Sequence, residues 1–136
     1  MSAPQTHIYL NSVAVDRSAE FERFLSETVE PILRDNRPDL VGKYRYLKAT
    51  QPDSDDPAVV TYAFIFDGGS LEDDWELQRL LSPHYGEEKA EALLEEWAET
   101  FAPLDQWLAA LGDRFAGAGQ IGWTFEAAGP TRQQAD

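Results

Sequence analysis

The sequence predicts one α+β domain whose elements follow in the order strand, helix, strand, strand, helices, strand. A length of 136 residues suits a single domain with an ordinary core. Four segments, at 7–15, 43–50, 58–67 and 120–126, are rich in β-branched and aromatic residues. The long segments between them carry apolar residues at helical spacing, which favours a sheet covered by helices.

The first strand alternates two sets of side chains. Ile8 and Leu10 fall on one side of the strand, whereas Tyr9 and Asn11 fall on the other. The second side therefore mixes polar and aromatic groups.

The first helix is indicated by apolar residues that recur every three or four positions. These are Phe21, Phe24, Leu25, Val29, Ile32 and Leu33. Pro31 has no backbone N–H, so it is expected to kink this helix or to start its last turn. Pro38 and the two residues before it then end the helix.

The second and third strands are expected to form a hairpin. Gly42 precedes the strand at 43–50, and the segment 51–57 has two prolines and three aspartates, a composition typical of an exposed turn. The strand at 58–67 is β-branched or aromatic almost throughout, which predicts a central position covered on both faces.

A second helical region begins near Leu71, where Ser70 and Asp73 resemble a capping box. The helix is expected to break around Pro83 and to resume by Glu87. A new apolar face then follows, formed by Ala90, Leu93, Leu94, Trp97, Ala98 and Phe101.

Near the end of the chain, the sequence predicts a short helix that starts at Pro103 and a final strand at 120–126. The tail at 127–136 has no periodicity and is expected to be disordered. The domain thus spans 1–126 and includes a helical insertion at about 87–111.

Composition excludes several classes of function. The chain has 25 acidic and 11 basic side chains, and its net charge of −14 would repel nucleic acids and anionic membranes. It has no cysteine, so disulfides and thiol chemistry are excluded, and no leader-like segment, so a cytoplasmic protein is expected. The sequence shows no metal-ligand cluster, phosphate-binding glycine motif or nucleotide fingerprint, so no metal site is predicted.

The order of elements is that of the split β-α-β arrangement of ferredoxin-like domains, with a four-stranded antiparallel sheet and helices on one face. Aromatic residues fall on both sides of several strands, so the second face must also be covered. A homodimer is the simplest way to cover it.

Residues 8–126 resemble the dimeric α+β barrel superfamily. The resemblance depends on the order of elements, on the run Pro31-Ile32-Leu33 ahead of Gly42, and on the aromatic third strand. It implies that two ferredoxin-like sheets face each other and that small pockets lie between sheet and helices.

Within that superfamily, the antibiotic-biosynthesis-type and haem-degrading monooxygenases are most similar. The haem-degrading proteins use an Asn on the first strand and a Trp followed about one helical stretch later by a His. Here Asn11 lies on the first strand, and His84 follows Trp75 by nine positions. The first group implies cofactor-independent oxygenation of an apolar or aromatic molecule, with Asn11 and His84 as catalytic residues. The second implies haem, with His84 on the iron, Asn11 near bound oxygen and Trp75 shaping the macrocycle. The helical insertion departs from both groups, and it is expected to cover the pocket or replace its ligand.

Five further residues are candidates for binding substrate: Trp75, Tyr85, Tyr62, Tyr9 and Arg45. Each has an ordinary structural alternative, since tryptophan and tyrosine commonly fill cores and Arg45 could form a salt bridge. His84 could equally be a surface residue that caps a neighbouring carbonyl.

A third hypothesis is not enzymatic. The insertion could carry a protein contact, in which case Trp97, Phe101 and Trp107 would be partly exposed.

Overall fold

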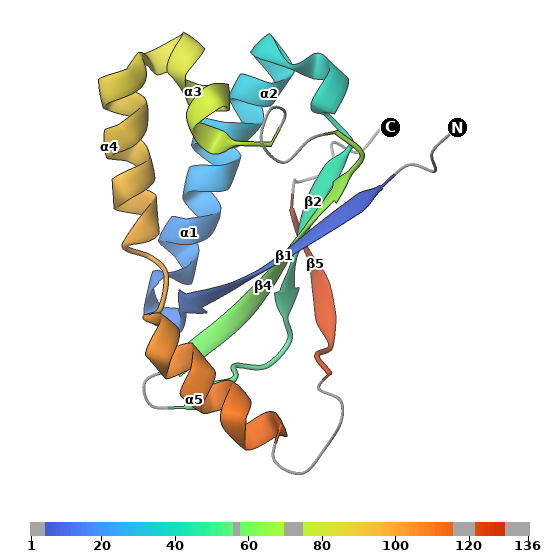
Figure 1. Ribbon diagram of the computed structural model, residues 1–136, viewed down its shortest axis with the longest axis vertical. Helices are drawn as coiled ribbons and strands as arrows, with labels where there is room; N and C mark the ends of the chain where they lie inside the picture. Colours follow the sequence, from blue (N-terminus) through green and yellow to red (C-terminus); the bar gives the residue numbers. More distant parts are fainter. Residues whose placement is uncertain (1–4, 56–57, 70–74, 116–121, 130–136) are drawn as a thin grey trace.

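A computed structural model describes residues 5–55, 58–69, 75–115 and 122–129 of the protein. These residues form one antiparallel sheet and five α-helices (Figure 1). The strands are β1 (Thr6–Ala14), β2 (Tyr44–Ala49), β3 (Ser54–Asp55), β4 (Ala58–Asp67) and β5 (Phe125–Gly129). The helices are α1 (Ser18–Phe24), α2 (Glu30–Asn36), α3 (Leu77–Tyr85), α4 (Glu87–Ala98) and α5 (Leu104–Phe115). The predicted α+β class is confirmed, and the architecture fits a ferredoxin-like fold.

The four principal strands lie in the order β1-β4-β2-β5, and the two-residue β3 pairs with the start of β4. β4 pairs antiparallel with both β1 and β2, and its residues from Val59 to Phe64 are all buried. The prediction that the third predicted strand is central and covered on both faces is therefore confirmed.

The chain after α4 lies along one end of β1. Phe101 bridges Val13, the Ala14 N–H donates to the Thr100 carbonyl at 3.1 Å, and the Ala102 N–H donates to the Ser12 carbonyl at 3.1 Å. This segment satisfies backbone groups at the outer edge of β1, where a further strand could otherwise pair.

Opposite faces of the sheet are covered by different helices. Helices α1 to α4 lie on the face that presents Tyr62 and Phe64 (Figure 1). α5 contacts the other face, where the Trp107 indole N–H donates to the Thr61 hydroxyl at 3.1 Å. Thr61 also donates to the Asp53 carboxylate, which accepts a second hydrogen bond from the Trp123 indole at 2.8 Å. These contacts hold α5 and the residues just before β5 against the sheet.

Some boundaries differ from those expected. α3 continues through Pro83 to Tyr85, and the chain turns at Gly86, whose φ of 87° favours glycine. The helix begins at Leu77, with Glu76 as its N-cap, whereas the predicted start near Leu71 lies outside the described residues.

The last strand lies farther along the chain than the alternation predicted. β5 begins at Phe125 and includes residues 127–129, which were assigned to the tail. Tyr46 explains this register, because it pairs with Gly129 and its ring would clash with any Cβ at that position. None of the described helices is long and apolar enough to cross a membrane.

Candidate functional site

A cavity of about 590 Å³ lies between the sheet and the helix layer. The sheet contributes residues whose side chains point toward the helices: Tyr9, Asn11, Tyr44, Phe64 and Phe66. The helices contribute mostly aliphatic residues: Leu25, Val29, Leu33, Leu77, Leu80, Leu94, Trp97 and Ala98. Trp75, Glu76 and Phe101 complete the wall from the connecting segments. The cavity is thus strongly apolar, with seven aromatic rings around it.

The wall on the first helix depends on a π-helical turn, Leu25–Val29, between α1 and α2. The Glu30 N–H donates to the Leu25 carbonyl, five residues back, because the turn is wider than in an α-helix. Pro31 follows directly, and it offers no N–H to the carbonyl four residues before it. The predicted kink therefore takes the form of a widened turn.

That turn aligns residues spaced four apart. In a straight α-helix with 3.6 residues per turn, such residues drift around the axis. A wider turn corrects the drift, so Leu25, Val29 and Leu33 all line the cavity. The sequence period alone marked these residues as core without distinguishing a filled core from a cavity wall.

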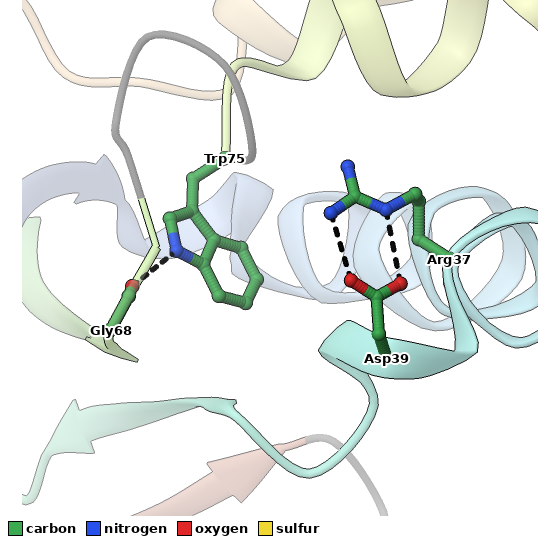
Figure 2. Close-up of polar contacts among 4 residues, drawn as sticks. All are labelled: Arg37, Asp39, Gly68 and Trp75. Carbon is green, nitrogen blue, oxygen red and sulfur yellow. Dashed lines mark hydrogen bonds and ion pairs between the residues drawn. The ribbon is translucent and has the colours of Figure 1, made fainter.

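Trp75 forms one part of the aromatic wall. Its ring stacks on Phe66 with centroids 4.6 Å apart and planes inclined by 26°, and it lies 6.2 Å from Tyr44. Its indole N–H donates to the Gly68 carbonyl at 2.9 Å, which fixes the ring orientation (Figure 2). The ring is 7% exposed.

Trp97 of α4 forms another part of the wall. It stacks on Phe21 at 5.2 Å and on Phe24 at 5.0 Å, and it meets Phe101 edge-on at 5.0 Å. Its indole N–H donates to the Phe21 carbonyl at 3.3 Å. Trp97 also lines a smaller hollow of about 220 Å³ between α4 and the first helix, so its ring separates the two spaces.

Partial exposure of Trp97, Phe101 and Trp107 was the expected sign of a protein contact. All three are partly exposed, but each contacts other residues of its own chain. Trp97 and Phe101 line the cavity, and Trp107 bonds to Thr61. Their partial exposure therefore does not indicate that they bind another protein.

Two oxygens near the cavity lack hydrogen-bond partners among the described residues, namely Tyr44 Oη and Glu30 Oε2. Burial raises the pKa of the Tyr44 phenol, and the charge of Glu30 raises it further. Burial also raises the pKa of Glu30, while Arg34 lowers it. Tyr44 therefore stays a neutral phenol.

Asn11, Tyr9 and Trp75 are the predicted site residues that line the cavity. Tyr62 lies deeper in the core and is not part of the lining. Its hydroxyl donates to the Glu22 carboxylate, and its pKa is raised first by burial and then by that contact.

Arg45, His84 and Tyr85 are not among the lining residues. Arg45 is exposed and alternates with residues that face the helices, so it points to the other side of the sheet. His84 is exposed near the end of α3, where its ring meets Tyr85 edge-on at 4.6 Å. The Lys89 ammonium lies 5.4 Å from the Tyr85 ring.

The lining lacks the haem ligand that the resemblance implies, because His84 is not among its residues. Among the described residues around the cavity there is no imidazole to ligate iron and no Lys or Arg to neutralise the propionates. Across the described ranges there is also no group of three or more metal-ligating side chains.

Comparisons of the chain with protein-family models, with curated proteins and with solved structures found no match.

Proposed function

We propose that the protein binds an apolar or aromatic small molecule in the cavity between its sheet and its helices. The observation that carries this proposal is a space of about 590 Å³ lined by seven aromatic residues. That volume lies within the usual range of small-molecule pockets, about 300–1,000 Å³. Water is a poor occupant, because the walls offer few hydrogen-bonding groups.

Titration with a neutral fluorescent probe, N-phenyl-1-naphthylamine, tests the proposal. We expect saturable enhancement of its fluorescence with one probe per chain. Ala98 lines the cavity at an exposed position, so Ala98→Phe should reduce the affinity about tenfold or more by occupying the space. Ala92→Phe is the matched control, because Ala92 is an exposed residue of the same helix outside the lining. Unsaturable enhancement, or equal loss in both variants, would contradict the proposal.

Cofactor-independent oxygenation is a second candidate, supported by the position of Asn11. Its amide is a neutral hydrogen-bond donor among apolar walls. Such a donor stabilises a substrate anion that reacts directly with oxygen, and the apolar walls limit competing water. Anthrone, which forms a stabilised carbanion, is a suitable probe. We expect oxygen uptake that Asn11→Ala abolishes. Oxygen uptake that Asn11→Ala leaves unchanged would contradict this enzymatic role.

We also propose a homodimer formed through the sheet face opposite the cavity. Two cross-strand rows occupy that face. Ile65 pairs with Ile8 on one side and Arg45 on the other, and Ala63 pairs with Leu10 and Leu47. Ile8 is 61% exposed and Leu10 is 40% exposed. A second copy is the favoured occupant, because these rows are mainly apolar and their charged residue, Arg45, is opposite in sign to the net charge of −14 on the other chain.

Light scattering after size exclusion tests the dimer. We expect twice the monomer mass of 15.3 kDa. Leu10→Glu should give monomers, because two buried carboxylates would then face each other. Val41→Glu is the control, since Val41 is 49% exposed and follows the turn Pro38–Leu40 instead of lying on this face. A wild-type monomer would contradict the proposed dimer.

A further inference from the structure

The described residues that line the cavity include a negatively charged side chain but no positively charged one. None of them is Lys, Arg or His, and the charged side chain among them is Glu76. An anionic ligand would therefore meet no compensating charge from these residues, whereas a cationic ligand would meet a carboxylate.

Two basic residues on neighbouring elements, Arg37 and Lys48, already pair with carboxylates. The Arg37 guanidinium binds Asp39 through two hydrogen bonds of 3.1 and 2.9 Å (Figure 2). The Lys48 ammonium lies 3.9 Å from Glu22. These two pairs add no net positive charge beside the cavity, and the chain as a whole carries a net charge of −14.

Glu76 is held in a defined position. It is the N-cap of α3, and its Oε2 accepts a hydrogen bond of 2.8 Å from the Arg79 backbone N–H. The residue is exposed, lines the cavity and directly follows Trp75 in the sequence, so it lies where the cavity meets solvent.

The aromatic walls also favour a positive charge on the ligand. The face of an aromatic ring is the negative end of its quadrupole, so a cation within about 6 Å of a ring centroid is attracted. Tryptophan gives the strongest attraction of this kind, and two of the seven rings are Trp75 and Trp97.

We infer that the cavity selects molecules with an aromatic or apolar body and a cationic group, such as a protonated or quaternary amine, over carboxylates with the same body. This inference depends on the proposed binding function and narrows its ligand class. Glu76 and the aromatic rings are the determinants of the charge preference.

Three naphthalenes that share one body test the inference: (2-naphthylmethyl)trimethylammonium, 2-naphthalenemethanol and 2-naphthylacetate. Their affinities are measured by isothermal titration calorimetry with the full chain in 0.5 M NaCl, which screens the net charge of the surface. We expect the cation to bind at least tenfold more tightly than the carboxylate, with the alcohol between them.

Glu76→Gln tests the contribution of the carboxylate while preserving an oxygen that caps α3. We expect its affinity for the cation to fall about threefold and its affinity for the alcohol to stay unchanged. Glu88→Gln, at an exposed position of α4 outside the lining, is the matched control and should change neither affinity.

The outcomes separate the two proposals. Binding of the alcohol with a cation preference below tenfold would overturn the charge selectivity and leave the binding function intact. Failure of all three compounds to bind would overturn the binding function itself. An unchanged cation affinity in Glu76→Gln would overturn the role of that residue.

Discussion

Trp75 stacks on Phe66 across the wall of the cavity, with ring centroids 4.6 Å apart, while its indole N–H donates to the Gly68 carbonyl. Phe66 belongs to the central strand, and Trp75 lies just before α3. The pair therefore joins the sheet to the segment that enters the second helical region, and it keeps an aromatic face toward the cavity.

Replacing Trp75 with phenylalanine separates stacking from hydrogen bonding. Trp75→Phe keeps an aromatic ring against Phe66 but leaves the Gly68 carbonyl without its indole donor. We expect the free energy of unfolding in urea to fall by about 1 kcal/mol. An unchanged value would show that the indole hydrogen bond does not contribute to stability.

Loss of the hydroxyl should have different effects on the free energy of unfolding at two tyrosines on the helix-facing side of the sheet. Tyr62 donates to the Glu22 carboxylate, so Tyr62→Phe should lower the free energy of unfolding by about 1.5–3 kcal/mol. The Tyr44 hydroxyl is buried with no partner among the described residues, so Tyr44→Phe should leave stability unchanged or raise it by about 1 kcal/mol. Chemical denaturation of both variants checks the contrast, and equal losses would contradict it.

The raised pKa of Glu30 predicts a pH dependence of stability. Burial raises this pKa above the usual 4.5, and Arg34 opposes part of the rise. The folded chain therefore retains a proton that the unfolded chain releases, so this contribution to stability is lost as pH rises from 4.5 to the raised pKa.

Glu30→Gln removes that titration. We expect the variant to gain stability relative to the wild type between pH 4 and pH 7, by less than about 1 kcal/mol because solvent screens a partly exposed carboxyl. Urea denaturation at both pH values measures the difference. A difference that stays constant with pH would show that burial does not perturb Glu30.

Pro31 should influence the cavity through the π-helical turn. Pro31→Ala supplies an N–H to the Glu27 carbonyl and so favours a regular α-helix through Leu25–Val29. Val29 and Leu33 would then rotate relative to Leu25 and change the shape of the cavity wall, so we expect probe affinity to fall at least threefold while stability is retained. Unchanged affinity would indicate that the turn does not depend on Pro31.

Much of the fold could be predicted from the sequence because strands and helices leave strong periodicities. The β-branched and aromatic run at 58–67 predicted the central strand, and alternation in the first strand placed Tyr9 and Asn11 on one side. The final strand was less predictable, since its register depends on Tyr46 meeting Gly129 from a distant part of the chain.

The cavity could be predicted only in part. Periodicity reports which face of an element is apolar, but not whether the space beside that face is filled. Leu25 and Trp97 therefore read as ordinary core residues, although both line the cavity. The Glu22 contact of Tyr62 was also hidden, because it joins residues 40 positions apart.

The indole N–H resonances of the four tryptophans test the central claim most directly. Trp75 and Trp97 line the cavity, whereas Trp107 and Trp123 bond to Thr61 and Asp53 away from it. Adding N-phenyl-1-naphthylamine to ¹⁵N-labelled protein should shift the resonances of Trp75 and Trp97 and leave the other two unchanged. Saturable probe binding that leaves the Trp75 and Trp97 resonances in place would contradict binding in this cavity.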